Sequence, residues 1–177
     1  MMKRTLIWLV LLALQGVVLL AQGADKIPKP TPEHKRLGYF VGKWTYEGEM
    51  KPSPFGPGGK VKTTDSCEWF SGGFSVVCHS DGTGPMGAVK GLGLLSYNAE
   101  EKKYVYFGVD NMGMAATSKG IREGDTWTYT GEDKMGGKLI KSRVIIKELS
   151  PTAYTFKFEM AEGAKWKTVM DGKETKK

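Results

Sequence analysis

The stretch CEWFSGGFSVVC, residues 67–78, contains the only two cysteines of the chain, with a Gly-Gly pair midway between them. Glycine is favoured at the centre of a two-residue hairpin turn because such turns need positive φ angles. Counting outward in equal steps from Gly72 and Gly73, Cys67 comes directly opposite Cys78. A four-residue loop centred on the same glycines gives the same pairing. The stretch therefore predicts an antiparallel β-hairpin whose cysteines face each other.

The opposed cysteines favour a structural disulfide over a redox pair or a metal clip. Facing residues of an antiparallel pair lie about 4.5 to 5.5 Å apart, which a disulfide accepts. The chain has no Cys-x-x-C redox motif, and two cysteines without further ligands at zinc-site spacing make a poor metal site. Two free thiols in a reducing compartment are the alternative. We predict a Cys67–Cys78 disulfide, which contributes on the order of 3 kcal/mol by the chain-entropy account, and no metal site.

Short alternating segments continue on both sides of this hairpin. Apolar and polar residues alternate with period two, and Gly-rich or polar turns separate the segments. The expected strands are 43–51, 60–71, 74–80, 89–97, 103–110, 114–122, 126–133, 138–149, 153–161 and 165–170. Strands joined by short turns favour an antiparallel meander, which closes to remove its edges. We predict an all-β fold, an antiparallel up-and-down β-barrel of about ten strands, with a short helical turn at 32–37 before the first strand.

The chain opens with MMKRTLIWLVLLALQGVVLLAQGADK, in which Lys3 and Arg4 precede an uncharged run over residues 5–21. A positive start, an apolar run and small residues at its end are typical of a secretory signal peptide. We expect cleavage before Ala24 and Sec-type export to the periplasm or the cell exterior. An uncleaved N-terminal anchor is the alternative, because the run approaches the length that spans a bilayer. After cleavage no stable membrane span is expected.

The remaining chain has the length of one domain with a substantial core. After a signal peptide over 1–23, we expect a flexible, Pro-rich linker over 24–36, a single β-barrel domain over 37–171 and a basic tail over 172–177. The formal net charge of +7 is spread along the chain without a long basic block. Nucleic-acid binding is therefore not expected.

Alternation also predicts which side chains face the barrel interior. In AYTFKFEMA, residues 153–161, Tyr154, Phe156 and Phe158 share one face of a strand. The candidate ligand-binding residues on the predicted interior face are Trp44, Tyr46, Trp69, Trp127, Tyr129, Phe156, Phe158 and Trp166. An aromatic lining of this kind forms either a filled core or the wall of a cavity, and periodicity does not separate the two.

The stretch VDNMGMAATSKG, residues 109–120, is the most polar candidate site. It places Asp110, Asn111 and Met112 together at a strand end. Asn and Asp are also ordinary turn formers, so the alternative is a turn whose methionines pack in the core.

The two histidines offer no catalytic or zinc site. His34 falls in the expected linker, and His79 lies on the face opposite Val76, where we expect solvent. No Ser or Cys nucleophile partner is visible for either of them.

Several segments in this order resemble a known family. They are GYFVGKWTYEGEM (38–50), WFSGGFSVVCHSDG (69–82), VKGLGLLSYNAEEKKYVYFGVDNMG (89–113) and GEDKMGGKLIKSRVIIKELSPTAYTFKFEM (131–160). Together they resemble the bacterial domain-of-unknown-function family numbered 1579. The resemblance implies a calycin-like barrel, similar in shape to lipocalins and nitrobindins, in an exported bacterial protein of undetermined function.

Two details of the resemblance bear on ligands. Gly42-Lys43-Trp44 is similar to the G-x-W of lipocalins, whose Trp closes one end of the barrel beneath an Arg of the last strand. The last expected strand here offers Lys165 and Lys167 instead. Nitrobindin-type barrels bind haem through a late His, and no His follows His79. We expect neither haem nor another cofactor.

These features favour a non-enzymatic barrel that binds a small apolar or amphipathic molecule among its interior aromatic residues. One alternative is an enzyme with a polar site at the barrel mouth near Asp110 and Asn111. Another is a filled barrel that acts through its outer surface. A hollow interior separates the binding hypothesis from the filled barrel.

Overall fold

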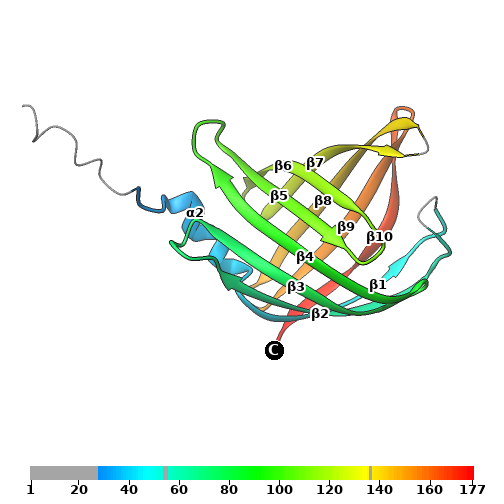
Figure 1. The fold of residues 1–177 in the computed structure, drawn as a ribbon, viewed down its shortest axis with the longest axis horizontal. Helices are drawn as coiled ribbons and strands as arrows, with labels where there is room; N and C mark the ends of the chain where they lie inside the picture. Colours follow the sequence, from blue (N-terminus) through cyan, green and yellow to red (C-terminus); the bar gives the residue numbers. More distant parts are fainter. Residues whose placement is uncertain (1–27, 54–55, 136) are drawn as a thin grey trace, which may run out of the picture.

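The computed structural model describes residues 28–53, 56–135 and 137–177, and within them ten antiparallel strands form a closed barrel (Figure 1). The strands are β1 (Gly42–Met50), β2 (Gly59–Trp69), β3 (Ser75–Gly84), β4 (Gly87–Asn98), β5 (Lys103–Asp110), β6 (Ala115–Glu123), β7 (Thr126–Met135), β8 (Lys138–Ser150), β9 (Ala153–Glu162) and β10 (Lys165–Lys176). A short helix, α2 (Pro32–Arg36), and a 3-10 helix, η2 (Leu37–Tyr39), precede them. The predicted barrel and helical turn are confirmed, whereas the expected signal peptide lies outside the described residues.

Each strand pairs antiparallel with the next one along the chain, and β1 pairs with β10 to close the barrel. β10 is longer than the sequence predicted, because the segment expected as a basic tail at 172–177 is instead strand as far as Lys176. Gly172 and Glu174 continue the inward alternation and pair with both β1 and β9. The exposed Lys173 between them points outward. Of the lysines that suggested a frayed tail, Lys173 lies on the outer side of a wall strand, whereas Lys176 lies over the Trp44 ring at the closed end.

The hairpin of β2 and β3 has the predicted register. Cys67 is the pairing partner of Cys78, and their sulfur atoms form a disulfide. The turn is the four-residue form, with Gly72 and Gly73 at its centre and positive φ at both. Cys67 packs in the core. A crosslink of this kind is typical of proteins in oxidising compartments.

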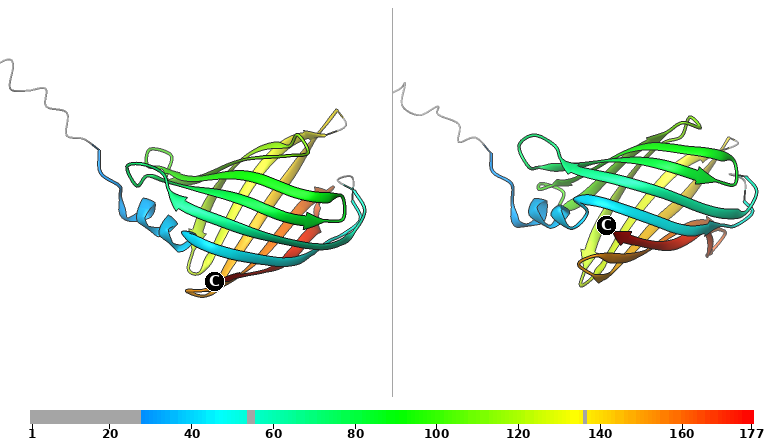
Figure 2. Two further views of the ribbon diagram at one scale, coloured as in Figure 1. Left: turned by 60° about the horizontal axis from the view of Figure 1, so that its bottom comes forward. Right: turned by 90° about the horizontal axis from the view of Figure 1, so that it is seen from below.

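The two ends of the barrel differ. Figure 2 shows α2 at the end of the barrel where the C-terminus also lies. Side chains of α2 and η2 pack into this end, which we call the closed end. The opposite end is formed by the β1–β2, β3–β4, β5–β6, β7–β8 and β9–β10 turns, and no helix of the described residues covers it. We call it the open end.

Helix α2 belongs to the domain, although the sequence suggested a flexible linker up to residue 36. His34 is only 5% exposed. Its ring packs edge-on against Phe74 and Tyr97, with centroids 5.1 and 5.4 Å away. His34 Nδ1 accepts a hydrogen bond of 3.1 Å from the Thr31 backbone N–H, which caps the helix. His79 is exposed on the outer wall, as predicted.

Candidate functional site

An aromatic plug, which we define as Leu37, Phe40, Trp44, Trp127 and Tyr154, fills the closed end of the barrel. Phe40 reaches across this end to Trp127 and Tyr154, at ring-centroid distances of 5.1 and 5.9 Å. Trp44 lies 4.9 Å from Tyr154, and its Nε1 donates to the Phe40 carbonyl. Leu37, Trp44 and Trp127 are fully buried. The closed end is therefore a packed core and not a ligand cavity.

Beyond the plug, tyrosine rings lie along the inner wall instead of crossing the barrel. Tyr129 covers Gly120, because a methyl group added at this glycine would come 2.6 Å from Tyr129 Cδ1. Tyr106 covers Gly93 in the same way, with 3.1 Å between the added carbon and Cε2. Each ring occupies the space that a side chain at the glycine would fill. The middle of the barrel wall is therefore lined by rings and backbone.

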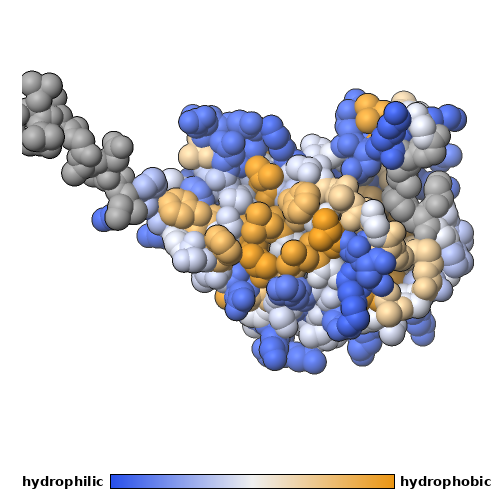
Figure 3. Space-filling model, in the orientation of Figure 1, coloured by the Kyte–Doolittle hydropathy of each residue, from blue (hydrophilic) through white to orange (hydrophobic). Residues whose placement is uncertain are grey.

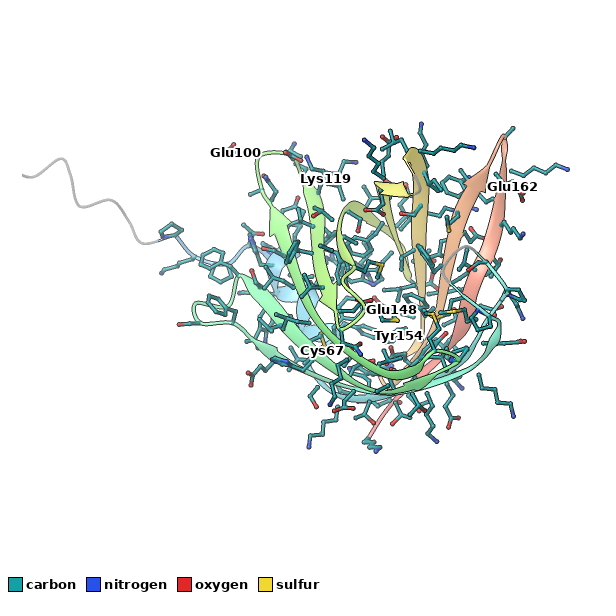
Figure 4. The ribbon with its side chains drawn as sticks, turned by 45° about the vertical axis from the view of Figure 1, so that its right-hand side comes forward. Cys67, Glu100, Lys119, Glu148, Tyr154 and Glu162 are labelled. Carbon is teal, nitrogen blue, oxygen red and sulfur yellow. A yellow bond between two sulfur atoms is a disulfide. The ribbon has the colours of Figure 1, made fainter. Side chains whose placement is uncertain are left out.

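Apolar side chains line the lumen between these tyrosines and the open end. Phe156, Phe158, Val144 and Met170 point inward by their alternation and pairing, yet solvent reaches each of them in part. Phe156 and Val144 also pack against the buried core. In Figure 4, Tyr154 lies deep between the strands, whereas Glu162 stands at the tip of β9. The half of the barrel toward the open end is therefore lined by apolar side chains that are less completely buried than those of the plug.

Two carboxyl groups lie on the inner wall just above the plug. Asp65 of β2 is paired with Trp44 and Ser80 on the neighbouring strands, and Glu174 of β10 is paired with Tyr46 and Tyr154. The side chains of Asp65 and Glu174 meet across β1 and share a hydrogen bond. We call these two residues the acid pair.

Hydroxyl groups surround the acid pair. Thr63 Oγ1 donates to Asp65 Oδ2 at 3.5 Å, and the Ser80 side chain also bonds to Asp65. The Tyr154 hydroxyl bonds to Glu174. Only 6% of Glu174 is exposed. Neutral hydroxyls satisfy these carboxyl groups in part, and no ion pair joins either of them to a lysine or arginine of the described residues.

Burial sets the protonation of the acid pair. It raises the pKa of Glu174 to about 8; the charge of Asp65 adds to this rise, and the hydrogen bond from Tyr154 opposes it. Burial also raises the pKa of Asp65, against hydrogen bonds from Ser80 and Glu174 that lower it. Two carboxyl groups this close in a low-dielectric interior do not both ionise at neutral pH. Near pH 7 the acid pair therefore holds a proton and does not carry two negative charges.

Three buried polar atoms of the inner wall have no hydrogen-bond partner among the described residues. They are Glu174 Oε2, Tyr46 Oη and Tyr129 Oη. Buried polar atoms in folded proteins are nearly always paired with protein, water or a ligand. These atoms lie on the inner wall above the plug, where water or a polar group of a bound molecule can satisfy them.

The outer wall has features of its own. Figure 3 shows apolar side chains gathered on the face formed by β4 and β5, where Leu92, Leu94 and Phe107 are exposed. A shallow groove of about 620 Å³ crosses the outer face of β8, β9 and β10, and both Lys157 and Asp171 line it. Charges of opposite sign offset each other there, and all three buried unpaired atoms described above lie on the other side of the wall.

The acid pair has no further ligands for a metal. Within residues 28–53, 56–135 and 137–177, no group of three or more His, Cys, Asp or Glu side chains is placed to hold a metal ion. In the same residues, no helix combines the length and apolar character needed to cross a membrane.

A comparison with protein families gives the relationship of this barrel. The profile described as "Protein of unknown function (DUF1579)" matches residues 29–176. The chain belongs to the DUF1579 family. The resemblance seen in the sequence is thereby confirmed.

One solved structure shows a similar fold at low identity, and two further barrels align with TM-scores below 0.5. The DUF1579 barrel is similar to Rv2717c from M. tuberculosis, with a TM-score of 0.61 and 11% identity over 84% of this chain and 99% of that one. A de novo designed fluorescence-activating beta barrel aligns with a TM-score of 0.46 and 14% identity, over 80% and 96% of the two chains. A redesigned beta barrel aligns with a TM-score of 0.41 and 13% identity, over 80% and 94%. No curated protein matches the chain.

The sequence-predicted site residues of the DUF1579 barrel fall in separate places. Trp44 and Trp127 lie in the plug; Tyr46, Tyr129, Phe156 and Phe158 line the lumen; Trp69 lies at the rim of the closed end; Asp110, Asn111 and Met112 lie in the β5–β6 turn at the open end; and Trp166 lies on the outer wall. Of the four lumen residues, Tyr46 pairs with Glu174 of the acid pair, and the Phe156 ring lies 5.8 Å from the Tyr46 ring.

The predicted inward position of Trp166 is wrong. β10 contains a register shift between Thr168 and Met170, which reverses the alternation on either side of it. Met170 pairs with Phe158 inside the barrel, whereas Trp166 is 38% exposed. The Arg143 guanidinium lies 4.3 Å from the Trp166 ring centroid on the outer wall.

In the β5–β6 turn, side-chain atoms of Asp110 and Asn111 form hydrogen bonds within the turn and to β4. Asp110 Oδ1 accepts hydrogen bonds from the backbone N–H groups of Met112 and Met114, at 2.8 and 2.9 Å. Asn111 accepts from Lys90 N at 2.8 Å and so ties the turn to β4. Met112 and Met114 are exposed, so the expected packing of these methionines in the core is wrong.

A lysine of the last strand lies over the Trp44 ring at the closed end. Because β10 extends to Lys176, Lys176 Nζ lies 5.1 Å from the Trp44 ring centroid. The lysines of the shorter expected strand, Lys165 and Lys167, lie near the open end and far along β10 from Trp44.

Sequence reasoning missed both members of the acid pair of this DUF1579 protein. Asp65 follows the same inward alternation as Cys67, and this signal was available in the sequence. Glu174 was assigned to a basic tail, so its alternation with Gly172 was not considered. The cross-strand pairing of β1 with β10 is what makes Glu174 an interior residue.

Proposed function

We propose that this DUF1579 protein binds one small amphipathic molecule inside the barrel. The observation that carries the proposal is that a polar region and an apolar region follow each other from the plug toward the open end. Buried polar atoms without partners among the described residues lie at the bottom, around Glu174 and Tyr46. Partly solvent-accessible apolar side chains, including Phe156 and Phe158, lie above them toward the open end. A ligand with a polar head and an apolar body satisfies both.

The two alternatives have less support. An enzyme centred on Asp110 and Asn111 would need polar atoms free to act on a substrate, but Asp110 Oδ1 and both polar side-chain atoms of Asn111 bond to the turn and to β4. A filled barrel would bury the inward side chains of its open half, and Phe156 and Val144 remain partly accessible to solvent. A binding site in the lumen therefore fits these observations better than either alternative.

A substitution that fills the lumen tests the proposal. Ser118 faces inward opposite Tyr106, and the neighbouring Thr117 is exposed on the outer face of the same strand. We expect wild type and Thr117→Trp to bind the neutral fluorophore Nile red with one site per chain, and Ser118→Trp to bind at least about tenfold more weakly. Fluorescence titration gives the affinities, and circular dichroism checks that both variants fold. Equal affinity in all three proteins would place the dye outside the barrel and contradict the proposal.

We also propose that the chain is exported and that residues 1–23 are removed. The Cys67–Cys78 disulfide and the charged, apolar and small-residue order of the N-terminal sequence support this. We expect the intact mass of the protein isolated from its own host to match a disulfide-bonded chain that begins near Ala24. A full-length chain with two titratable thiols would contradict the proposal.

A further inference from the structure

We infer that the barrel selects cationic amphiphiles: molecules whose protonated amine binds the acid pair while their apolar body lies toward the open end. This inference rests on the proposed function, because it names the chemical class of the ligand in the same lumen. Its basis is that Asp65 and Glu174 lie together at the bottom of the lumen and that Glu174 Oε2 has no partner among the described residues.

The charge of the inner wall is opposite to that of the whole protein. The chain carries a formal net charge of +7, but most lysines lie on outward positions, such as the exposed Lys62, Lys90 and Lys157. The acid pair faces inward. A cation inside the barrel therefore meets the acidic side chains of the acid pair, although the protein as a whole is positively charged.

The inward basic side chains near the closed end are already engaged. Arg122 Nε lies 3.1 Å from Glu148 Oε1, and the Arg122 guanidinium also lies over Trp127. Lys176 lies over the ring of Trp44. An anionic head group at the bottom of the lumen would thus lie beside the acid pair. Among the described residues, no unengaged cation near the closed end offsets the repulsion between these negative charges, so the binding of such a head group is unfavourable. Fatty acids and other anionic amphiphiles are disfavoured for this reason.

The acid pair presents the hydrogen-bond pattern that an ammonium group needs. Glu174 is more than nine-tenths buried, and its Oε2 has no partner among the described residues. An ammonium group supplies several donors, and the hydroxyl oxygen of Tyr46, which pairs with Glu174, has no partner among the described residues and can accept one of them. Because burial holds a proton on Glu174 near neutral pH, an arriving ammonium releases that proton to solvent and takes its place. Binding should therefore strengthen as the pH rises from 6 toward 8.

Three straight-chain probes with one body and different heads test the inference. Decylamine, decanol and decanoate are titrated into the wild-type protein at pH 8 by calorimetry, below their aggregation concentrations. We expect decylamine to bind at least about tenfold more tightly than decanol, and decanoate to bind most weakly. In the Asp65→Asn/Glu174→Gln variant, the advantage of decylamine over decanol should disappear.

A charge-matched control separates the acid pair from overall charge. Glu47→Gln/Asp81→Asn removes two exposed carboxylates of the outer wall and should keep the preference for decylamine. If decanol or decanoate binds wild type as tightly as decylamine, the inference is overturned while binding in the lumen stands. If none of the three probes binds and Ser118→Trp leaves Nile red affinity unchanged, the proposed function is overturned as well.

Discussion

Replacing Trp127 with alanine is expected to lower the free energy of unfolding by about 3–5 kcal/mol. Trp127 is completely buried and packs edge-on against Phe40 and Tyr104, with centroids 5.1 and 4.7 Å away. Its Nε1 also donates to Glu148 Oε1 at 2.6 Å. The substitution would leave a cavity in the plug and remove a donor from a partly buried carboxylate. Urea unfolding followed by circular dichroism measures the loss.

Trp166→Ala is the matched control. This tryptophan lies on the outer wall and packs only one face against the Arg143 guanidinium. We expect its loss to cost less than about 1 kcal/mol. Equal losses for the two variants would contradict the assignment of Trp127 to the packed closed end and of Trp166 to the surface.

The stability of the wild-type protein should fall as the pH rises from about 4.5 to about 8, the interval between the ordinary and the folded pKa of Glu174. In the folded protein, burial and the neighbouring Asp65 keep Glu174 protonated over this interval, whereas the unfolded chain releases the proton. The folded state binds more protons than the unfolded state, so stability is fully present below the ordinary pKa and decreases through the folded pKa. The slope contributed by this group is at most about 1.4 kcal/mol per pH unit.

Glu174→Gln should flatten this part of the pH profile. Glutamine has nearly the same shape but no proton to release. Asp65 from β2, Tyr46 from β1 and Tyr154 from β9 face residue 174, and Asp65 contributes to the remaining slope because burial also raises its pKa. Urea unfolding at several values between pH 5 and pH 9 gives the two profiles. Glu162→Gln, at the exposed tip of β9, is the control that should match wild type. Parallel profiles for wild type and Glu174→Gln would contradict the buried acid pair.

The sequence was sufficient to predict the barrel and the register of the hairpin formed by β2 and β3. Alternation was readable because nearly every strand separates an apolar inner face from a charged outer face, as in β9 with Phe156 inward and Lys157 outward. The two glycines at the turn placed Cys67 opposite Cys78 without further information. These are local consequences of strand geometry.

The position of a residue along the barrel axis was not predictable in the same way. Trp44 and Phe156 share the inward face, yet α2 and η2 place Trp44 in a fully buried plug, while Phe156 packs against the core and stays partly accessible to solvent. That difference depends on which end the helices cover, and this is a tertiary property. Trp166 was misplaced because a β-bulge reversed the alternation at one position.

The acid pair was missed because inward residues were predicted from apolar side chains at alternate positions, and Asp65 and Glu174 are carboxyl groups at such positions. An inward glutamate near a lysine-rich terminus resembles a solvated tail, since buried carboxyl groups are rare and costly. Local violations of folding rules are expected where function requires them. Glu174 and Asp65 are therefore the residues on which the proposed binding site is centred.

Native mass spectrometry of the protein purified from its own host without detergent tests the central claim most directly. We predict that the wild-type chain carries one non-covalently bound small molecule, that Thr117→Trp retains it and that Ser118→Trp loses it. A bare wild-type chain, or the same adduct on Ser118→Trp, would contradict a binding site inside the barrel.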